Sequence, residues 1–227
     1  MSKLGASMWF GAGMPDPAIA TERLVLRPFV ATDVDDLCAI QSRADVVRYL
    51  YWGVRTRAEV VDVLVDRAPM TRLDVEGDVL DLAVQRQDTG RVIGDVSLRL
   101  ASLEHRQGEI GFVFHPDHQG QGYAREAATA MLDLAFGSAG LHRVYGRTDA
   151  RNTASAGLMR RLGMRQEAHF VHNEMFKGEW SDELVYAVLA QEWTNSASTS
   201  RISAADSAMV ASPTDSSTRR TPGTPVS

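Results

Sequence analysis

The amino-acid sequence predicts an α/β fold in which helices and strands form mixed layers around one sheet. Two patterns indicate this class: runs in which apolar and polar residues alternate, and runs with apolar residues at helical spacing. Their order along the chain is a strand, two helices, a meander, a helix, a strand, a helix and a hairpin. This order favours mixed α/β layers over a doubly wound parallel sheet.

The first elements are one strand and two helices. Residues 21–28 alternate up to a proline and predict a strand. Asp33 is expected to cap the first helix, whose apolar residues follow at helical spacing. Thr56-x-x-Glu59 has the form of a capping box, so the second helix is expected to start there.

A meander and a long helix follow. Residues 79–85 and 92–100 alternate on either side of a turn at 88–90, which predicts a hairpin. The apolar run at 110–114 predicts the next strand, and the apolar stripe at 124–135 predicts an amphipathic helix. The remaining expected elements are a strand at 141–148, a helix at 152–162 and a hairpin of residues 167–176 and 183–189 across a loop at 178–182.

Composition predicts one soluble domain at 21–193, preceded by a loose arm at 1–20 and followed by a disordered tail at 194–227. The tail is rich in Ser, Thr, Ala and Pro and has almost no large apolar residues. A net charge of -5 argues against a nucleic-acid partner, and no segment has the length of a membrane span. The single cysteine, Cys38, indicates a reducing compartment, so we expect a cytoplasmic protein. No metal-ligand spacing is present in the sequence, so we expect no metal. We expect a monomer or a homodimer.

The most informative stretch runs from His118 to Glu126, between the apolar run and the amphipathic helix. Gly120 and Gly122 allow the backbone to approach a ligand closely, and the first amides of the helix have no intrahelical acceptor. Such a loop predicts an anion site, although the same glycines also suit an ordinary turn. The dinucleotide fingerprint does not fit because Arg125 stands where it needs Gly or Ala, and the P-loop sequence is absent.

The pattern Gln119-x-x-Gly122-x-Ala124 resembles the acyl-CoA pyrophosphate loop of the GNAT superfamily of N-acetyltransferases. The resemblance covers residues 21–193, and its other motifs are Glu109-Ile110-Gly111-Phe112, Asn152-x-x-Ser155, Leu162-Gly163-Met164 and Gly178-Glu179-Trp180-Ser181-Asp182 with Tyr186. Together they are similar to the branch of the ribosomal-protein N-terminal acetyltransferases. The resemblance implies a mostly antiparallel sheet with a splayed strand pair, flanked by helices, and acetyl-CoA as acetyl donor.

Three groups of residues are expected to bind the donor. By resemblance, backbone groups at the strand end pair with the pantetheine arm, amides of the glycine loop hold the phosphates, and one residue before the next helix touches CoA. These residues are Phe112, Val113 and Phe114 for the strand, Gln119, Gly120, Gln121, Gly122, Tyr123, Ala124 and Arg125 for the loop, and Asn152.

Acetyl transfer to an amine also needs a proton for the leaving thiolate and a base for the amine. Ser155 is the candidate acid by resemblance, with helix capping as the alternative role. A tyrosine acid on that helix is excluded, because residues 158–161 are Leu-Met-Arg-Arg. Glu109 and Asp95 are the candidate bases, with a bound water or a solvated strand position as alternatives.

The predicted function is acetyl-CoA-dependent N-acetylation by direct attack in a ternary complex, because no nucleophile is placed for a covalent intermediate. A protein N-terminal α-amine is the favoured acceptor, since its pKa of about 7.7 to 8.0 lies below that of lysine, about 10.4. One alternative is a small-molecule amine, such as an antibiotic or an amino-acid-like metabolite. A second alternative is a non-catalytic acyl-CoA-binding regulatory module.

Overall fold

The computed structural model describes residues 18–195, and the chain divides into two compact units, residues 1–190 and 191–227. The fold below is that of residues 18–190. The predicted arm at 1–20 and tail at 194–227 lie outside the described residues, except for the last three residues of the arm and the first two of the tail. No helix in the described part is both long and apolar enough to cross a bilayer.

Eight strands form one sheet in the order β1-β2-β3-β4-β5-β6-β8-β7. Every neighbouring pair is antiparallel except β5 and β6, which are parallel. The strands are β1 (Ile19–Ala20), β2 (Leu24–Arg27), β3 (Val79–Arg86), β4 (Val92–Ser102), β5 (Gln107–Phe114), β6 (Arg143–Asp149), β7 (Arg165–Phe176) and β8 (Glu179–Leu189). The predicted mixed α/β class and mostly antiparallel sheet are confirmed.

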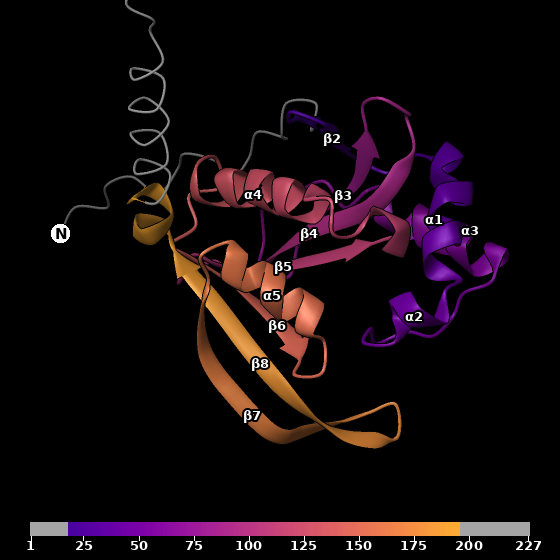
Figure 1. The fold of residues 1–227 in the computed structure, drawn as a ribbon. Helices are drawn as coiled ribbons and strands as arrows, with labels where there is room; N and C mark the ends of the chain where they lie inside the picture. The colour runs from indigo at the N-terminus through magenta and orange to yellow at the C-terminus, as the bar shows by residue number, and fades with distance from the viewer. Residues whose placement is uncertain (1–17, 196–227) are drawn as a thin grey trace, which may run out of the picture. The chain divides into compact units, whose positions relative to one another are not determined.

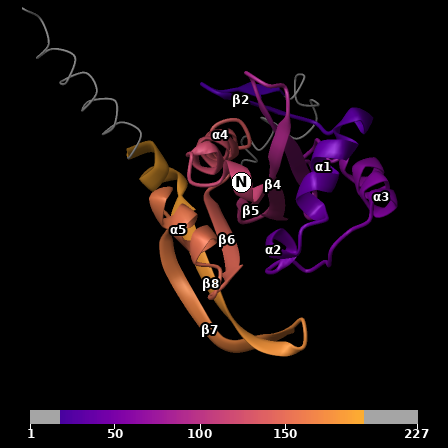
Figure 2. The same ribbon diagram turned by 45° about the vertical axis from the view of Figure 1, so that its right-hand side comes forward.

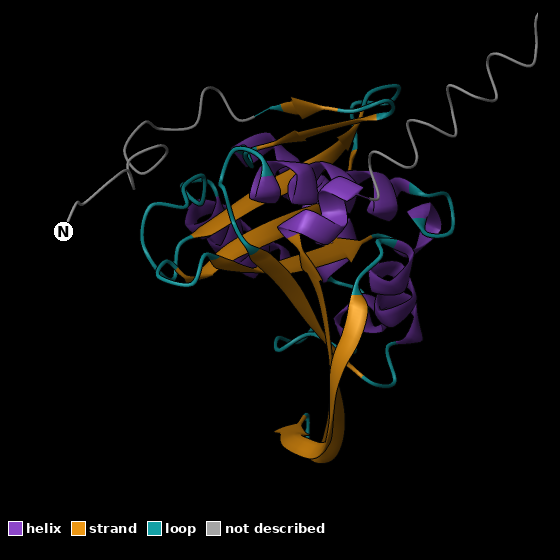
Figure 3. Cartoon of the chain, turned by 90° about the vertical axis from the view of Figure 1, so that its left-hand side faces the viewer, coloured by secondary structure: helices purple, strands orange, loops and turns teal. Residues whose placement is uncertain are grey.

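The helices cover both faces of this sheet. They are α1 (Val34–Gln41), α2 (Ala44–Val47), α3 (Arg57–Arg67), α4 (Tyr123–Phe136) and α5 (Thr153–Arg161), with 3₁₀ turns η1 (Ala31–Asp33) and η2 (Pro116–His118). Helices α1 and α3 lie on one side of the central strands and α4 on the other, as Figures 1 and 2 show. The β7–β8 hairpin extends well beyond the helical layer (Figure 1, Figure 3).

Local sequence signals explain the start of α3 and the buried face of α4. The Thr56 side chain accepts a hydrogen bond from the Glu59 N–H, and the Glu59 carboxylate accepts one from the Thr56 N–H, so the predicted capping box is confirmed. On α4, the apolar stripe is buried against the sheet, with Ala127, Ala128 and Met131 fully covered. These contacts fix the position of the loop that precedes α4.

Two local predictions were wrong. Asp33 precedes α1, but its side chain does not cap that helix; it accepts from the Val30 N–H at 2.9 Å and pairs with Arg27 at 2.7 Å. The predicted loop at 178–182 is mostly strand, because the turn needs only Lys177 and Gly178. Both have positive φ, 50° and 89°, which matches the tight two-residue turns that suit twisted hairpins.

Candidate active site

The site begins where strands β5 and β6 separate. They pair only at residues 107–109 of β5 and 143–145 of β6. Beyond this point β5 continues to pair with β4 as far as Phe114, and β6 pairs with β8. The edge of β5 that faces β6 therefore carries backbone N–H and C=O groups without a strand partner from Ile110 onward, which is where an extended ligand can add hydrogen bonds.

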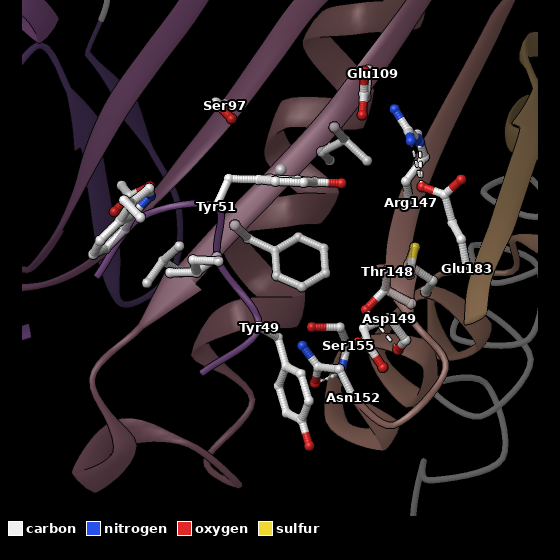
Figure 4. A pocket seen from close by; sticks show the side chains of 18 of the residues that line it. Tyr49, Tyr51, Ser97, Glu109, Arg147, Thr148, Asp149, Asn152, Ser155 and Glu183 are labelled. Carbon is white, nitrogen blue, oxygen red and sulfur yellow. Dashed lines mark hydrogen bonds and ion pairs between the residues drawn. The ribbon is translucent and has the colours of Figure 1, made fainter. Parts of the chain in front are cut away.

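A cavity of about 280 Å³ lies at this divergence. Its wall is built from β4, β5 and the end of α3, from β6, β7, β8 and α5, and from the segment that follows α2. In Figure 4, Asn152 and Ser155 lie together at one end of the cavity, while Glu109, Arg147 and Glu183 lie at the other. The cavity thus joins segments that are far apart in the sequence.

Six of the residues predicted from the sequence are brought together by this cavity. They are Asp95, Glu109, Phe112, Val113, Asn152 and Ser155. The remaining candidates do not belong to its wall: Phe114 is buried, and the glycine loop follows the end of β5.

The glycine loop has the geometry of a phosphate cradle. Gly122 is the N-cap of α4 with φ of 85°, and Gly120 has φ of 73°, a backbone conformation that other residues rarely adopt. Glu126 makes the first bond of α4, from its N–H to the Gly122 oxygen at 3.0 Å, so the preceding amides have no intrahelical acceptor. A Cβ added at Gly122 would lie 3.2 Å from Arg23 Nη2. The open amides at the positive helix end fit the pyrophosphate of a CoA donor.

Side chains that the sequence did not single out hold this loop. Arg23 Nη1 donates to the Gln121 carbonyl oxygen at 3.0 Å, and Arg23 Nε donates to Glu126 at 2.7 Å. The Thr21 hydroxyl donates to the same Glu126 carboxylate at 2.6 Å. Gln119, predicted as a donor-binding residue, uses its side-chain amide to bond the Phe114 carbonyl oxygen at 3.1 Å. The segment before β2 therefore fixes the loop from outside.

The start of α5 places Asn152 and Ser155 on the cavity wall. Asn152 is the N-cap, and its side-chain oxygen accepts a hydrogen bond from the Ser155 N–H at 3.2 Å. The cap thus uses the Ser155 backbone and leaves its hydroxyl out. Helix capping explains why an asparagine occupies position 152, but it does not explain why residue 155 has a hydroxyl group.

The two candidate bases have different surroundings. Glu109 is partly exposed and lies 3.4 Å from both Tyr145 Oη and Arg99 Nη1. Asp95 is 4% exposed and lies opposite Val113 of β5, so the alternative of a solvated strand position is wrong for Asp95. Its carboxylate is 3.3 Å from Arg67 on α3, and burial raises the pKa of Asp95 against the opposing effect of that guanidinium.

The cavity is covered by the tip of the β7–β8 hairpin and the segment after α2. Lys177 Nζ donates to the carbonyl oxygens of Val47 at 2.6 Å and Trp52 at 3.1 Å. The rings of Tyr51 and Phe176 meet edge to face with centroids 5.5 Å apart. Sequence reasoning missed this cover; the aromatic sequence Tyr49-Leu50-Tyr51-Trp52 between two helices was the available signal.

Carboxylates dominate the cavity wall. Five of them line it, against the two guanidinium groups of Arg67 and Arg147. The carboxylates are Asp95, Glu109, Asp149, Glu174 and Glu183. Arg147 is bound to the buried Glu183 at 2.6 Å, so it is already neutralised within the wall. Three of the carboxylates also have basic partners: Asp95 pairs with Arg67, Asp149 with Arg151 at 2.7 Å and Glu109 with Arg99 at 3.4 Å. Glu174 instead accepts a hydrogen bond from the Tyr51 hydroxyl at 3.0 Å, so the negative charge that can attract a cationic ligand lies chiefly at Glu174.

An open strand edge next to an anion-binding helix start is the arrangement expected of a protein that holds an acyl-CoA: the strand edge suits the amides of pantetheine and the helix start suits the phosphates. The carboxylate-lined cavity beside them suits an amine. Fold and site together define a CoA-dependent acyltransferase.

Comparison with known proteins identifies the family. The acetyltransferase (GNAT) domain matches residues 23–165, so the chain belongs to the GNAT family of N-acetyltransferases, which use acetyl-CoA. An uncharacterized N-acetyltransferase of Bacillus subtilis, YnaD, is 34% identical over 175 residues, which are 77% of this chain and 98% of the relative. The spermidine N(1)-acetyltransferase of Escherichia coli is 23% identical over 172 residues, 74% of this chain and 87% of the relative. A GNAT acetyltransferase structure from Bacillus anthracis has a TM-score of 0.68 and 30% identity, covering 77% of this chain and 99% of that one.

Proposed function

We propose that this enzyme transfers the acetyl group of acetyl-CoA to the primary amine of a small, positively charged acceptor. The transfer takes place by direct attack while both substrates are bound. The observation that carries the proposal is the cavity wall, with five carboxylates against two guanidinium groups at the divergence of β5 and β6.

The size of the cavity supports a small acceptor. Its volume, about 280 Å³, is just below the range of small-molecule sites, roughly 300 to 1,000 Å³. The hairpin tip and the segment after α2 are held together over it by Lys177. A relative that acts on spermidine, a small cationic amine, is consistent with this choice.

The residues of the chain have separate tasks in this proposal. Amides of residues 120–125 and the backbone of 112–114 bind and orient the donor, and Asn152 lies beside it on the start of α5. Bound acetyl-CoA supplies the thioester whose acetyl group is transferred. A wall carboxylate removes the proton from the acceptor ammonium, and the Ser155 hydroxyl provides a proton for the departing sulfur. Cys38 lies on α1 and is not part of the cavity wall, which supports direct attack over a thioester intermediate on this cysteine.

A protein N-terminal α-amine, favoured by the resemblance to the ribosomal-protein branch, is the second candidate acceptor. Its support is the rim of the cavity, where Tyr51 is 73% exposed, so that the end of a chain can reach the opening. An α-amine needs less help from a base than an alkyl amine does. A non-catalytic acyl-CoA-binding role remains the alternative if neither acceptor is acetylated.

The test is release of free thiol from acetyl-CoA in the presence of three sets of acceptors. These are small cationic amines including spermidine, aminoglycoside and amino-acid amines, and peptides with a free N-terminus. Acetylated product is identified by mass spectrometry. The proposal predicts the highest kcat/KM for small cationic amines; a preference for peptides selects the second candidate, and binding of acetyl-CoA without turnover of any amine contradicts both.

A further inference from the structure

A cluster of three charged side chains lies behind the acceptor cavity. Arg67 extends from the end of α3 toward neighbouring strands β3 and β4, with Nε 3.2 Å from Asp81 and Nη1 3.3 Å from Asp95. The three side chains are only 16%, 6% and 5% exposed. Arg67 and Asp95 belong to the cavity wall, whereas Asp81, which pairs with Arg67, does not.

The hydrogen bonds of this cluster are incomplete. In the described part of the chain, four buried side-chain polar atoms have no hydrogen-bond partner, and three of them are Arg67 Nη1, Asp81 Oδ1 and Asp95 Oδ2. Arg67 therefore lies within ion-pair distance of Asp81 and Asp95, but Arg67 Nη1 and Asp95 Oδ2 do not form a hydrogen bond. Buried polar groups are normally satisfied by protein atoms, ordered water or a ligand, so these atoms have hydrogen-bonding capacity that water or a polar ligand in the adjoining cavity can use.

We propose that Asp81 and Asp95 act as one proton-accepting unit, positioned by Arg67, which takes the proton from the ammonium group of the acceptor. Asp95 is the catalytic residue because it alone of the two carboxylates reaches the cavity. Asp81 and Arg67 are positioning residues. The inference rests on the proposed function and names the base within it.

The surroundings give this unit a proton affinity suited to work near neutral pH. Burial, followed by the charge of Asp95, raises the pKa of Asp81 to about 7. Arg67 opposes this shift, and Arg55, from the segment before α3, together with Arg67 opposes the raised pKa of Asp95. Two carboxylates facing one guanidinium hold one proton more readily than either carboxylate alone does, so the titration belongs to the pair.

The proton balance is simple. When both carboxylates are ionised, an N–H bond of the acceptor ammonium breaks, the proton passes to Asp95, and the amine nitrogen keeps the electron pair that attacks the thioester. The pair then holds one proton, which it shares with Asp81 and later loses to water. A lone carboxylate paired with Arg67 is a weaker base and drives this step less well.

The experiment compares pH profiles of kcat/KM for spermidine in the wild type, Asp81→Asn and Glu109→Gln. The wild-type acid limb is expected near pH 7, where the pair loses its proton. In Asp81→Asn, the pH at which kcat/KM falls on the acid side is expected to decrease by about one to three pH units, because the negative charge beside Asp95 is removed. The same change is expected to lower kcat. Asp62→Asn, an exposed position on α3, is the matched control and should leave the profile unchanged.

Two outcomes overturn the inference. One is a folded Asp81→Asn enzyme whose acid limb coincides with that of the wild type, and the other is a limb that moves in Glu109→Gln instead. If Asp81→Asn does not fold, infrared titration of the wild type decides: a protonated carboxyl band that persists above about pH 6 supports the shared proton, and its absence contradicts it. Failure to acetylate any amine overturns the proposed function itself.

Discussion

The backbone and the side chain of Ser155 have separate surroundings. Its N–H takes part in the cap at the start of α5, where the Asn152 side chain accepts the hydrogen bond. Its hydroxyl takes no part in that cap, although the residue lies on the cavity wall. Stability and catalysis can therefore be separated at this position.

We expect Ser155→Ala to lower kcat by about 10²- to 10⁴-fold, the usual contribution of a positioned acid. The melting temperature and the Kd of acetyl-CoA should change little, because the cap is intact. Steady-state kinetics with saturating amine and thermal unfolding are the two measurements. Asn152→Ala is the companion variant, and it should lose about 0.5 to 2 kcal/mol of unfolding free energy with the cap. Full kcat in Ser155→Ala would show that the hydroxyl has no catalytic role.

We expect donor binding to depend strongly on Gly122. Its φ of 85° is strained for any side chain, and a carboxylate there would enter the space of a phosphate. Gly122→Asp is expected to weaken acetyl-CoA binding roughly tenfold or more, as measured by calorimetry.

A control is needed for the backbone strain alone. Gly163, after α5, has φ of 80° and no atom within 4 Å of an added Cβ. Gly163→Ala should reduce stability to a similar degree and leave the Kd of acetyl-CoA unchanged. Equal affinities in Gly122→Asp and the wild type would remove the glycine loop from the site.

At the scale of elements, the β7–β8 hairpin and the segment after α2 form the cover of the acceptor cavity. Lys177→Met removes both hydrogen bonds that join them and keeps the length of the side chain. The KM of the amine should rise by about threefold to tenfold, because bonds from a charged donor each contribute roughly 1.5 to 3 kcal/mol before solvent exposure reduces them.

The Kd of acetyl-CoA and the variant Lys177→Arg serve as controls for Lys177→Met. The proposed acetyl-CoA site at the glycine loop does not include Lys177, so the Kd of acetyl-CoA should not change in Lys177→Met. Lys177→Arg, which retains a charged donor, should recover part of the amine affinity. An unchanged amine KM in Lys177→Met would show that the hairpin tip is not part of the acceptor site.

Sequence patterns predicted which helices and strands form better than they predicted where each one begins and ends. The capping box at Thr56 and the stripe on α4 are local signals, and both were confirmed because local hydrogen bonds and one buried face determine them. Asp33 was misjudged because a partner from β2, Arg27, competes for its carboxylate. The start of β8 was misjudged because the mostly polar residues 179–182 were taken as loop, whereas they pair with β7 in the hairpin.

At the scale of the whole molecule, the cluster of Arg67, Asp81 and Asp95 links stability to pH. The pKa of Asp81 is about 7 in the folded protein and 3.8 in its ordinary state, so folding favours the protonated form. The stability that this group contributes is complete below about pH 4 and is lost as the pH rises to about 7. Asp81→Asn abolishes this loss.

We therefore expect the stability of Asp81→Asn relative to the wild type to increase between about pH 4 and pH 7. Thermal unfolding of both proteins across this interval measures the difference. Asp62→Asn serves as the control and should follow the wild-type curve at every pH. Parallel curves for Asp81→Asn and the wild type would show that Asp81 is ionised in the folded protein.

The sequence predicted part of the candidate site. Most of the predicted donor-binding residues lie on one continuous stretch, from β5 through the glycine loop to α4, where motif spacing can be read directly, and the predicted Asp95, Glu109, Asn152 and Ser155 line the cavity. The acceptor half combines Tyr51, Asp81, Glu174 and other residues from separate elements. Only the pairing of the strands and the fold of the hairpin bring these residues together, and no local pattern records those contacts.

The most direct test of the account is a crystal structure of the protein with CoA and spermidine. We predict the pyrophosphate at the amides of residues 120–125, the pantetheine arm along the open edge of β5 at 112–114, and the amine in the cavity with its ammonium group near Asp95. CoA bound away from the divergence of β5 and β6, or the amine bound outside the carboxylate-lined cavity, would contradict it.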